Sequence, residues 1–402
     1  MALMGGLGGL GGLGGLGGLG GLGGLGGLGG LGGLGGLGGL GGLGGLGGLG
    51  GLGGLGGLGG LGGFQGSGAA SQYSGTETIG LMTAAEAIGY VADPSNAESL
   101  RTDDIGDCAD WVRGSLYLSA FLSNISWDIT SGGKFVLQTG SKNLANLPSS
   151  PDLDMLKGQI VQMAKYADQR GERSPEITSQ LGFPTNYFGM IMGMNSPRYR
   201  QIGELVLLTQ VLTSHVCMIA KTSLAVPRPD QVSAAVMPMI ATPKHGSYPS
   251  AHAAEAFAVS ELLQHILDVE EEKMGGDSNR DTANRKQLVA KMAERVAVNR
   301  TVAGVHYPVD SWAGAIIGRA VTRLILTMGG AKLTSGDVKL VEQTLDPNDR
   351  TTFSTDANAT FANLDFNLNA FEDIKPTETA APTYANTAPI AWLYDRAVAE
   401  LT

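Results

Sequence analysis

Residues 246 to 258 read Gly246-Ser-Tyr-Pro249-Ser250-Ala251-His252-Ala-Ala-Glu-Ala-Phe-Ala258. A proline turn followed by small residues predicts the start of a helix, with Ser250 as its N-cap. The free N–H groups and the positive dipole end of such a helix can bind an anion. His252 falls in the first turn, so its imidazole can reach the same anion. Taken alone, the pattern fits equally well a histidine that has no ligand.

A second segment places two cations seven residues apart, at the predicted end of the preceding helix. It reads Lys221-Thr-Ser-Leu-Ala-Val-Pro227-Arg228-Pro229. The prolines stop the helix and stiffen the turn that presents Arg228. Arginine offers a planar fork of donors to an oxyanion, and lysine adds a compact charge. In isolation, basic residues near a helix C-terminus more often interact only with the helix dipole.

A third segment reads Asn299-Arg300-Thr-Val-Ala-Gly-Val-His306-Tyr-Pro308-Val-Asp310. Arg300 precedes His306 by six residues, and Asp310 follows it by four. Pro308 breaks the backbone, so the next helix is expected to start at residues 307–310. Asp310 can then accept a hydrogen bond from one imidazole nitrogen and fix which nitrogen faces a ligand. By itself, the segment is explained more simply by an Arg300–Asp310 salt bridge beside a core histidine.

Together, the three segments predict one catalytic site for a phosphate-shaped oxyanion. They bring three cationic side chains, a helix N-terminus and two histidines next to proline or glycine turns. An acidic chain has little reason to concentrate such donors for solubility. The predicted site consists of Lys221, Arg228, Ser250, His252, Arg300 and His306.

Helical patterns dominate the chain around these segments, which predicts an all-α protein built as a helical bundle. Helices are expected over residues 107–126, 153–167, 198–224, 251–272, 282–304, 308–328, 335–344 and 388–400. Alternation typical of a strand is scarce, and residues 134–138 are its best case. Residues 346–382 are rich in Asn, Thr and Asp and are expected to wrap over the helices as a loop-rich segment.

The first 63 residues are a low-complexity repeat of Gly-Gly-Leu. Glycine loses the most backbone entropy on ordering, so this tract is expected to be disordered. The alternative is a polyproline-II-like helix, whose three residues per turn would align the leucines along one edge. Residues 64–82 are predicted to be a linker, and residues 83–402 one helical domain whose motifs lie within 200–325. That domain is expected to open with a capping box over Thr83 to Glu86.

The overall charge and the cysteine content exclude several functional classes. The formal net charge of −10 is unsuited to a general nucleic-acid binder or to a protein held on anionic membranes. The two cysteines, Cys108 and Cys217, are too few for a metal cluster or a disulfide scaffold. Neither a secretory signal nor an apolar run long enough to span a membrane is apparent. The chain is therefore expected to be soluble, with a cytoplasmic location slightly favoured.

The three segments resemble the signature of the type 2 phosphatidic acid phosphatase and vanadium-dependent haloperoxidase superfamily. That signature is Lys-x6-Arg-Pro, then Pro-Ser-Gly-His, then Arg-x5-His-x3-Asp, and its order and gaps match between residues 221 and 310. The resemblance implies that Lys221, Arg228 and Arg300 neutralise the oxyanion, while Ser250 and the N–H of Ala251 add hydrogen bonds. Ala251 departs from the family, which usually has glycine there; it keeps the N–H and is expected to tighten the pocket slightly.

Two chemistries of this superfamily use the same frame. For a haloperoxidase, the resemblance implies that His306 is the ligand to vanadium in a vanadate cofactor and that His252 serves as acid–base. Hydrogen peroxide and a halide, with bromide or iodide favoured, are then the substrates. For a soluble acid phosphatase, the resemblance implies that His306 attacks a phosphate ester, that Asp310 orients it, and that His252 protonates the leaving group.

His245 favours the haloperoxidase branch. It lies seven residues before His252 and resembles the extra histidine at that spacing in vanadium bromoperoxidases, near their halide-binding region. An ordinary loop histidine is the alternative of equal weight. A third hypothesis is a non-enzymatic scaffold whose Gly-Gly-Leu tract mediates assembly, and family habit also suggests a homo-oligomer.

Overall fold

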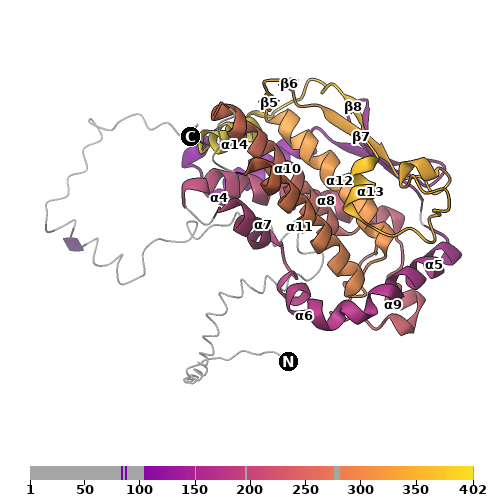
Figure 1. The fold of residues 1–402 in the computed structure, drawn as a ribbon. Coiled ribbons are helices and arrows are strands. Elements are labelled where there is room, and N and C mark those ends of the chain that lie inside the picture. The colour runs from indigo at the N-terminus through magenta and orange to yellow at the C-terminus, as the bar shows by residue number, and fades with distance from the viewer. Residues whose placement is uncertain are drawn as a thin grey trace.

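The computed structural model describes residues 104–149, 151–194, 197–275 and 281–401, together with Thr83, Ala84 and Ala87. The predicted Gly-Gly-Leu tract and linker lie outside the described residues, and so does part of the predicted capping box at residues 83–86. Helices dominate the described part of the chain, as predicted, and a small sheet accompanies them (Figure 1).

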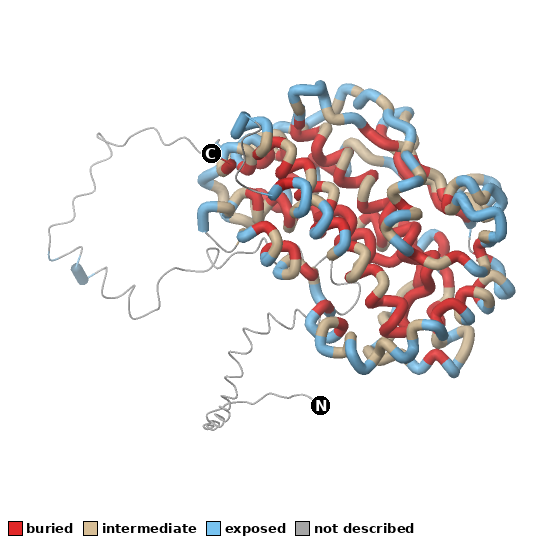
Figure 2. Tube along the Cα trace, in the orientation of Figure 1, coloured by how far each residue is buried: buried red, intermediate tan, exposed pale blue. Residues whose placement is uncertain are grey.

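Four long helices form the centre of the molecule (Figure 1). They are α8 (Arg200–Leu224), α10 (Ala251–Lys273), α11 (Thr282–Val302) and α12 (Pro308–Met328). Each coincides with a predicted helix to within two residues at either end. Helix α10 packs against the other three, and the buried residues concentrate along this group (Figure 2). The predicted helical bundle is therefore confirmed.

Local capping explains where α10 and α12 begin. The Ser250 hydroxyl oxygen accepts a hydrogen bond from the N–H of Ala253 at 3.3 Å, as an N-cap does. Pro308 occupies the first turn of α12, where its missing N–H leaves no helical bond unmade. The Asp310 carboxylate reaches back to accept the N–H of Tyr307 at 3.1 Å. Both helices thus start at residues that the motifs contain.

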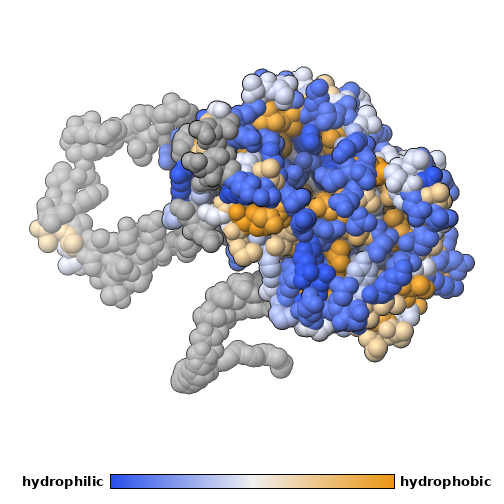
Figure 3. Space-filling view, in the orientation of Figure 1, coloured by the Kyte–Doolittle hydropathy of each residue, from blue (hydrophilic) through white to orange (hydrophobic). Residues whose placement is uncertain are grey.

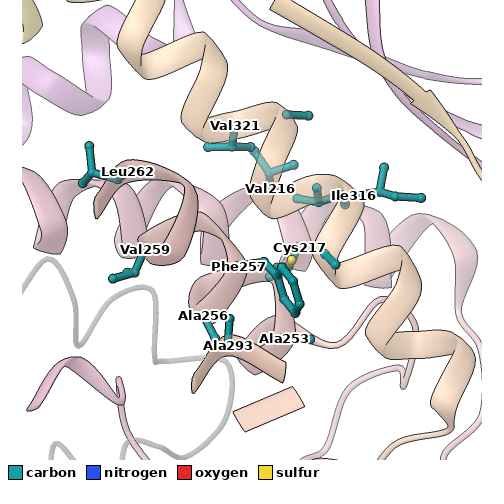
Figure 4. Packing of buried hydrophobic residues seen from close by; sticks show 14 of the residues in the cluster. Val216, Cys217, Ala253, Ala256, Phe257, Val259, Leu262, Ala293, Ile316 and Val321 are labelled. Carbon is teal, nitrogen blue, oxygen red and sulfur yellow. The ribbon is translucent and has the colours of Figure 1, made fainter. Parts of the chain in front are cut away.

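Two glycines bring α12 very close to α10. A Cβ atom at Gly314 would overlap the carbonyl oxygen of Ser250, and one at Gly318 would overlap that of Ala254. Small side chains continue this close packing on the other sides of α10, where Figure 4 shows Ala256 beside Ala293 of α11. The contact holds the first turn of α10 against the first turn of α12.

A five-stranded sheet lies against α12, with strand order β2-β3-β4-β7-β8 (Figure 1). The strands are β2 (Ser126–Ile129), β3 (Phe135–Thr139), β4 (Lys142–Leu147), β7 (Leu340–Thr344) and β8 (Thr377–Thr379). Neighbouring strands are antiparallel except β4 and β7, which run parallel with Ala145 opposite Gln343. Strand β3 confirms the strand predicted at residues 134–138, whereas the rest of the sheet was not predicted.

The helix predicted at residues 335–344 is wrong. The chain there forms β6 (Gly336–Asp337), which pairs with β5 (Lys332–Leu333), and then β7. Gly336 adopts a φ of +129°, which lies outside the helical region. Leu340 and Val341 are buried, and hydrogen bonds to β4 and β8 replace those that a helix would make within itself.

Residues 346–382 run over α10 and α12 as the expected wrap. This segment contains η6 (Arg350–Thr352), α13 (Leu368–Asp373) and β8. Phe366 and Phe371 pack against Trp312 of α12 at ring-centroid distances of 5.6 and 5.8 Å. The indole of Trp312 also donates to the carbonyl oxygen of Asp365 at 2.9 Å. Aromatic contacts therefore hold an otherwise irregular segment on the bundle.

Shorter elements complete the fold. They are η2 (Ile105–Asp107), α4 (Asp110–Leu122), α5 (Leu153–Met163), η3 (Ala164–Gln169), α6 (Arg170–Ser179), α7 (Thr185–Met192), η4 (Pro197–Tyr199), α9 (Pro229–Val232), η5 (Ala234–Val236) and α14 (Ala388–Ala399). Helices α4, α5 and α14 confirm predicted helices, and each is shorter than expected. Helices α6 and α7 were not predicted, and α6 contains Pro175 in its interior.

One described segment, Pro197–Val232, has the length and hydropathy of a membrane-spanning helix. However, 67% of its most apolar window is buried inside the protein, because it contains the central helix α8. Figure 3 shows hydrophilic residues over much of the face in view, with smaller apolar areas between them. The apolar character of this segment is therefore accounted for by its place in the core.

Candidate active site

The three predicted segments meet at one end of the bundle. Lys221 lies in the last turn of α8, Ser250 caps α10, and His306 lies in the turn between α11 and α12. The side chains expected to bind the oxyanion are withdrawn from solvent, together with Asp310. Exposed fractions of only 0 to 4% are found for Lys221, Arg228, Ser250, Arg300, His306 and Asp310. Such a concentration of buried polar groups indicates a binding site rather than a solvated surface.

Arg228 connects the three segments. Its Nη1 donates to the carbonyl oxygen of Val305 at 2.7 Å and lies 3.1 Å from Nε2 of His306. Its Nε donates to the carbonyl oxygen of His245 at 2.9 Å, and its Nη2 lies 3.1 Å from Nδ1 of that residue. The guanidinium is thereby anchored on two backbone oxygens and faces two imidazoles.

The His306 imidazole is held at both nitrogens. Its Nδ1 lies 2.7 Å from Oδ2 of Asp310, and its Nε2 faces Arg228, which can only donate. The proton therefore sits on Nδ1, and Nε2 carries the lone pair. Burial, together with the positive charges of Arg228 and Lys221, lowers the pKa of His306 well below its ordinary value. The imidazole is neutral near pH 7 and presents a nucleophilic or metal-binding nitrogen.

The Asp310 carboxylate is the centre of a small hydrogen-bond network. Its Oδ2 accepts from His306, from the N–H of Tyr307 and from the hydroxyl of Ser247. Burial raises the pKa of Asp310 to about 6, and the hydrogen bond from Ser247 and the charge of Lys221 oppose that rise. The group is therefore mainly ionised near pH 7, which is the state that orients His306.

Lys221 ties the end of α8 to the loop before α10. Its Nζ donates to the carbonyl oxygens of Gly246 at 3.0 Å and Ser247 at 2.7 Å. Burial, and then the positive charge of Arg228, lowers the pKa of Lys221 to about 7. A bound anion would favour the charged ammonium and raise this pKa again.

The first turn of α10 is fixed against α12. The Ser250 N–H donates to the carbonyl oxygen of Asp310 at 2.9 Å, and its hydroxyl oxygen accepts from Ala253 as described. Ala251 follows with 8% of its surface exposed. The first N–H groups of a helix have no partner within the helix, so this turn keeps the anion-binding character expected from the sequence.

His252 and Arg300 share the backbone oxygen of Gln180, just beyond α6. His252 Nε2 lies 2.8 Å from this oxygen, and Arg300 Nη1 lies 3.4 Å from it. A carbonyl oxygen only accepts, so His252 carries a proton on Nε2. Burial, and then the charge of Arg300, lowers the pKa of His252 to about 3. Since Arg300 faces Gln180, the simpler reading of an Arg300–Asp310 salt bridge finds no support among the described residues.

The structure places His245 at the wall of this site. It is partly buried beside Arg228, and burial together with the charges of Lys221 and Arg228 lowers its pKa to about 4. When protonated, His245 also helps to lower the pKa of His306, after burial and the charges of Arg228 and Lys221. His245 thus lies beside a cation of the predicted oxyanion site, and its role in halide chemistry stays a prediction.

Three further residues belong to the site although they were not predicted. Gln180 accepts from Arg300 through its side-chain oxygen at 3.1 Å and from His252 through its backbone. It precedes His252 by 72 residues and sits in no recognisable motif, so the sequence carries no signal for it. Ser247 and Glu255 stand inside the stretch quoted first, but only the packing of the helices shows that they face the site.

These features define a class of protein. It is a helical bundle that gathers buried cations and histidines between helix ends and orients one imidazole with a carboxylate. Residues 203–333 match the family model of the PAP2 superfamily. The superfamily includes phosphatases and haloperoxidases, so the resemblance drawn from the three motifs is confirmed at this level. No curated protein matches the chain significantly.

Proposed function

We propose that the protein is a vanadium-dependent haloperoxidase that oxidises bromide or iodide with hydrogen peroxide. The observation that carries the proposal is the position of His245, whose Nδ1 lies 3.1 Å from Nη2 of Arg228. A phosphatase needs one imidazole to attack phosphorus and one to protonate the leaving group, and His306 and His252 suffice for that. A third imidazole beside the oxyanion exceeds this requirement and fits a site that also handles a halide.

The residues of the site fit vanadate, which has the shape of phosphate. Lys221, Arg228 and Arg300 are buried cations that would neutralise its oxygens. The Nε atom of Arg300 is buried and has no hydrogen-bond partner among the described residues, as expected for a donor whose partner is a bound anion. His306 offers a neutral Nε2, the form of imidazole that binds metals. When bound, vanadate would supply the activation of hydrogen peroxide toward halide.

The protein's own side chains would hold the anion and move protons. Asp310 keeps the proton of His306 on Nδ1, so Nε2 stays available to the ligand. The Nη1 N–H of Arg228 that faces His306 can instead donate to the anion, while the backbone oxygens of Val305 and His245 keep the guanidinium in position. His252 is neutral near pH 7 because its pKa is lowered, and with its proton on Nε2 it has an unprotonated Nδ1 that can accept a hydrogen bond from a substrate.

A soluble acid phosphatase is the second candidate, and the His306–Asp310 pair favours it. In this reaction Nε2 of His306 attacks the phosphorus of a monoester, and the bond from phosphorus to the alcohol oxygen breaks. His252 gives a proton to that oxygen, and water then hydrolyses the phosphohistidine to release phosphate. This requires a doubly protonated His252, a state that burial and the charge of Arg300 oppose and that a bound anion would favour. The phosphatase ranks second because it leaves the third imidazole, His245, without a role.

Two assays on one purified sample test the proposal. The first is bromination of monochlorodimedone by hydrogen peroxide, with and without orthovanadate, and the second is hydrolysis of p-nitrophenyl phosphate. We expect bromination that depends on vanadate and is lost in His306→Ala. His265→Asn is the matched control, because this buried histidine contacts Tyr394 and lies outside the described site.

Each of the remaining results of these two assays would support one of the alternative hypotheses. Hydrolysis that vanadate inhibits, without bromination and with a phosphohistidine absent from His306→Ala, would make the protein a phosphatase. Neither activity, together with self-association that disappears when residues 1–63 are deleted, would support the non-enzymatic scaffold. His245→Ala adds a finer test, since it should raise the KM for bromide and leave ester hydrolysis unchanged.

A further inference from the structure

A buried carboxyl lies among the cations of the site, and neither proposed reaction uses it. Glu255 follows His252 by three residues on α10, and only 3% of it is exposed. A glutamate is rarely buried to this extent unless it has a partner of opposite charge or is protonated. Its surroundings therefore decide its charge.

Two helices present polar groups to Glu255. On α8, the hydroxyl of Ser214 is hydrogen-bonded to the carboxyl, and the positive charge of Lys221 acts on it. On α11, the positive charge of Arg300 acts on it as well. The thiol of Cys217, also on α8, lies close enough for Glu255 to contribute to the raised pKa of that thiol. Glu255 thus interacts with two of the three cations that are expected to bind the oxyanion.

The third neighbouring helix, α12, packs against the backbone of α10 through Gly314 and Gly318, which carry no charge. Burial raises the pKa of Glu255 to about 8, and the hydrogen bond to Ser214 and the two cations oppose that rise only in part. A bound oxyanion would add negative charge at the same cations, which favours the protonated carboxyl further.

We propose that, in mildly alkaline solution, Glu255 takes up a proton when an oxyanion binds, so that the site captures its anion together with a proton. The inference rests on the proposed oxyanion site, and it holds whether vanadate or a phosphate ester is the ligand. Protonation ends the competition of the carboxylate for Lys221 and Arg300, whose charges then act on the anion alone. Glu255 is a positioning residue, because it acts through these two cations.

The proposal gives anion affinity a definite dependence on pH. Anion binding raises the pKa of Glu255, so the complex holds more protons than the free protein, and affinity falls as the pH rises above about 8. The fall reaches about tenfold per pH unit for one linked proton. Lys221, whose pKa is lowered to about 7, adds a dependence of the same sign. An infrared measurement distinguishes Glu255 from Lys221, because of these two side chains only the protonated glutamate has a C=O stretch.

Difference infrared spectroscopy of the full chain on sulfate binding tests the proposal. Sulfate is a phosphate-shaped dianion that does not titrate in the neutral range, so a proton taken up belongs to the protein. Slightly above the pKa of Glu255, we expect sulfate to produce the C=O stretch of a protonated carboxyl and to remove a carboxylate band. Glu255→Gln should lack both changes and, one pH unit above that pKa, bind sulfate about tenfold more tightly than the wild type.

Two further variants make the test specific. Glu270→Gln is the matched control, because Glu270 is a buried glutamate of α10 that pairs with Arg285 at 3.3 Å, and its spectrum should match the wild type. Ser214→Ala gives an independent test if Glu255→Gln folds poorly. It removes the hydrogen-bond partner of the carboxyl and should shift the frequency of the new C=O stretch.

The outcomes distinguish this inference from the proposed function. Sulfate binding without a carboxyl signal, or with a signal that survives in Glu255→Gln or is unmoved in Ser214→Ala, would overturn the role of Glu255 and leave the oxyanion site intact. Failure of the wild type to bind sulfate, and likewise inorganic phosphate, would overturn both.

Discussion

Asp310 accepts a hydrogen bond from His306 at 2.7 Å across the first turn of α12. The same oxygen, Oδ2, also accepts the backbone N–H of Tyr307 at 3.1 Å. One carboxylate oxygen therefore holds the start of the helix and orients the imidazole. The position of His306 follows from how α12 begins, and not from a separate positioning element.

Asp310→Asn should separate the charge of this group from its shape. The amide keeps an oxygen for the N–H of Tyr307, but it loses the charge that holds the proton on His306 Nδ1. We expect turnover, in whichever assay reports activity, to fall about 10–100-fold with little change in melting temperature. Asp281→Asn, at the N-cap of α11, should leave turnover unchanged. A similar loss of turnover in both variants would contradict this role of Asp310.

Arg228→Lys should keep the charge and lose the fork of donors. The carbonyl oxygens of Val305 and His245 would lose their partners, so the free energy of unfolding in urea should fall by about 1–3 kcal/mol. The dissociation constant for sulfate should rise about tenfold or more, because a lysine cannot bind bidentately. In the control Arg285→Lys, stability should fall without a change in sulfate affinity. Unchanged sulfate affinity in Arg228→Lys would remove Arg228 from the anion site.

The buried histidines predict a loss of stability in mild acid. Burial lowers the pKa of His252 from 6.5 to about 3, and that of His306 well below 6.5. Below pH 6.5 the unfolded chain therefore binds more protons than the folded one, and the free energy of unfolding decreases as the pH falls. We expect a slope of up to about 1.4 kcal/mol per pH unit for each such histidine. Urea unfolding at a series of pH values checks this, and His252→Asn should reduce the slope. An unchanged slope in His252→Asn would show that this histidine is not buried in the neutral form, because the variant leaves the opposing contributions of Glu255 and Asp310 in place.

Gly318→Ala tests the close contact between α10 and α12. The added Cβ would overlap the carbonyl oxygen of Ala254, a backbone atom that moves only if the helix moves. We expect the free energy of unfolding to fall by about 1–3 kcal/mol. Gly203→Ala on α8 is the control, since an added Cβ there meets nothing within 4 Å. That variant should gain about 0.5–1 kcal/mol, because alanine is the better helix former. Equal stabilities of the two variants in thermal unfolding would contradict the packing argument.

Features that depend on neighbouring residues could be predicted from the sequence. The helices at 251–272 and 308–328 have caps and apolar periodicity within their own segments, and both appear in the structure. Strand β7 could not be predicted in this way. Its neighbour β4 lies far away in the sequence, with Asn146 and Thr344 in contact across 198 residues. Without that partner, residues 335–344 show only a short apolar pattern that a helix would also satisfy.

The same distinction between local and distant signals applies to the residues of the site. The residues within the motifs were found because charged and imidazole groups at fixed spacing are uncommon. Gln180 was missed because it binds His252 through a backbone oxygen, which every residue possesses. Glu255 stands within the quoted stretch, yet only the packing of α8 and α11 shows that it faces Lys221 and Arg300.

The parallel pairing of β4 and β7 closes the chain around every motif residue of the site. Strand β4 precedes α8 and β7 follows α12, so the segment between them forms one large loop joined at its base. During translation, this loop cannot close until residue 344 has left the ribosome, and until then the face of α12 that β7 covers is exposed. A fragment restricted to residues 203–333 would keep that face exposed permanently. Shortened expression fragments should therefore extend from α4 through α14, because these two helices cover α8, and nascent chains that stop before β7 should need chaperones.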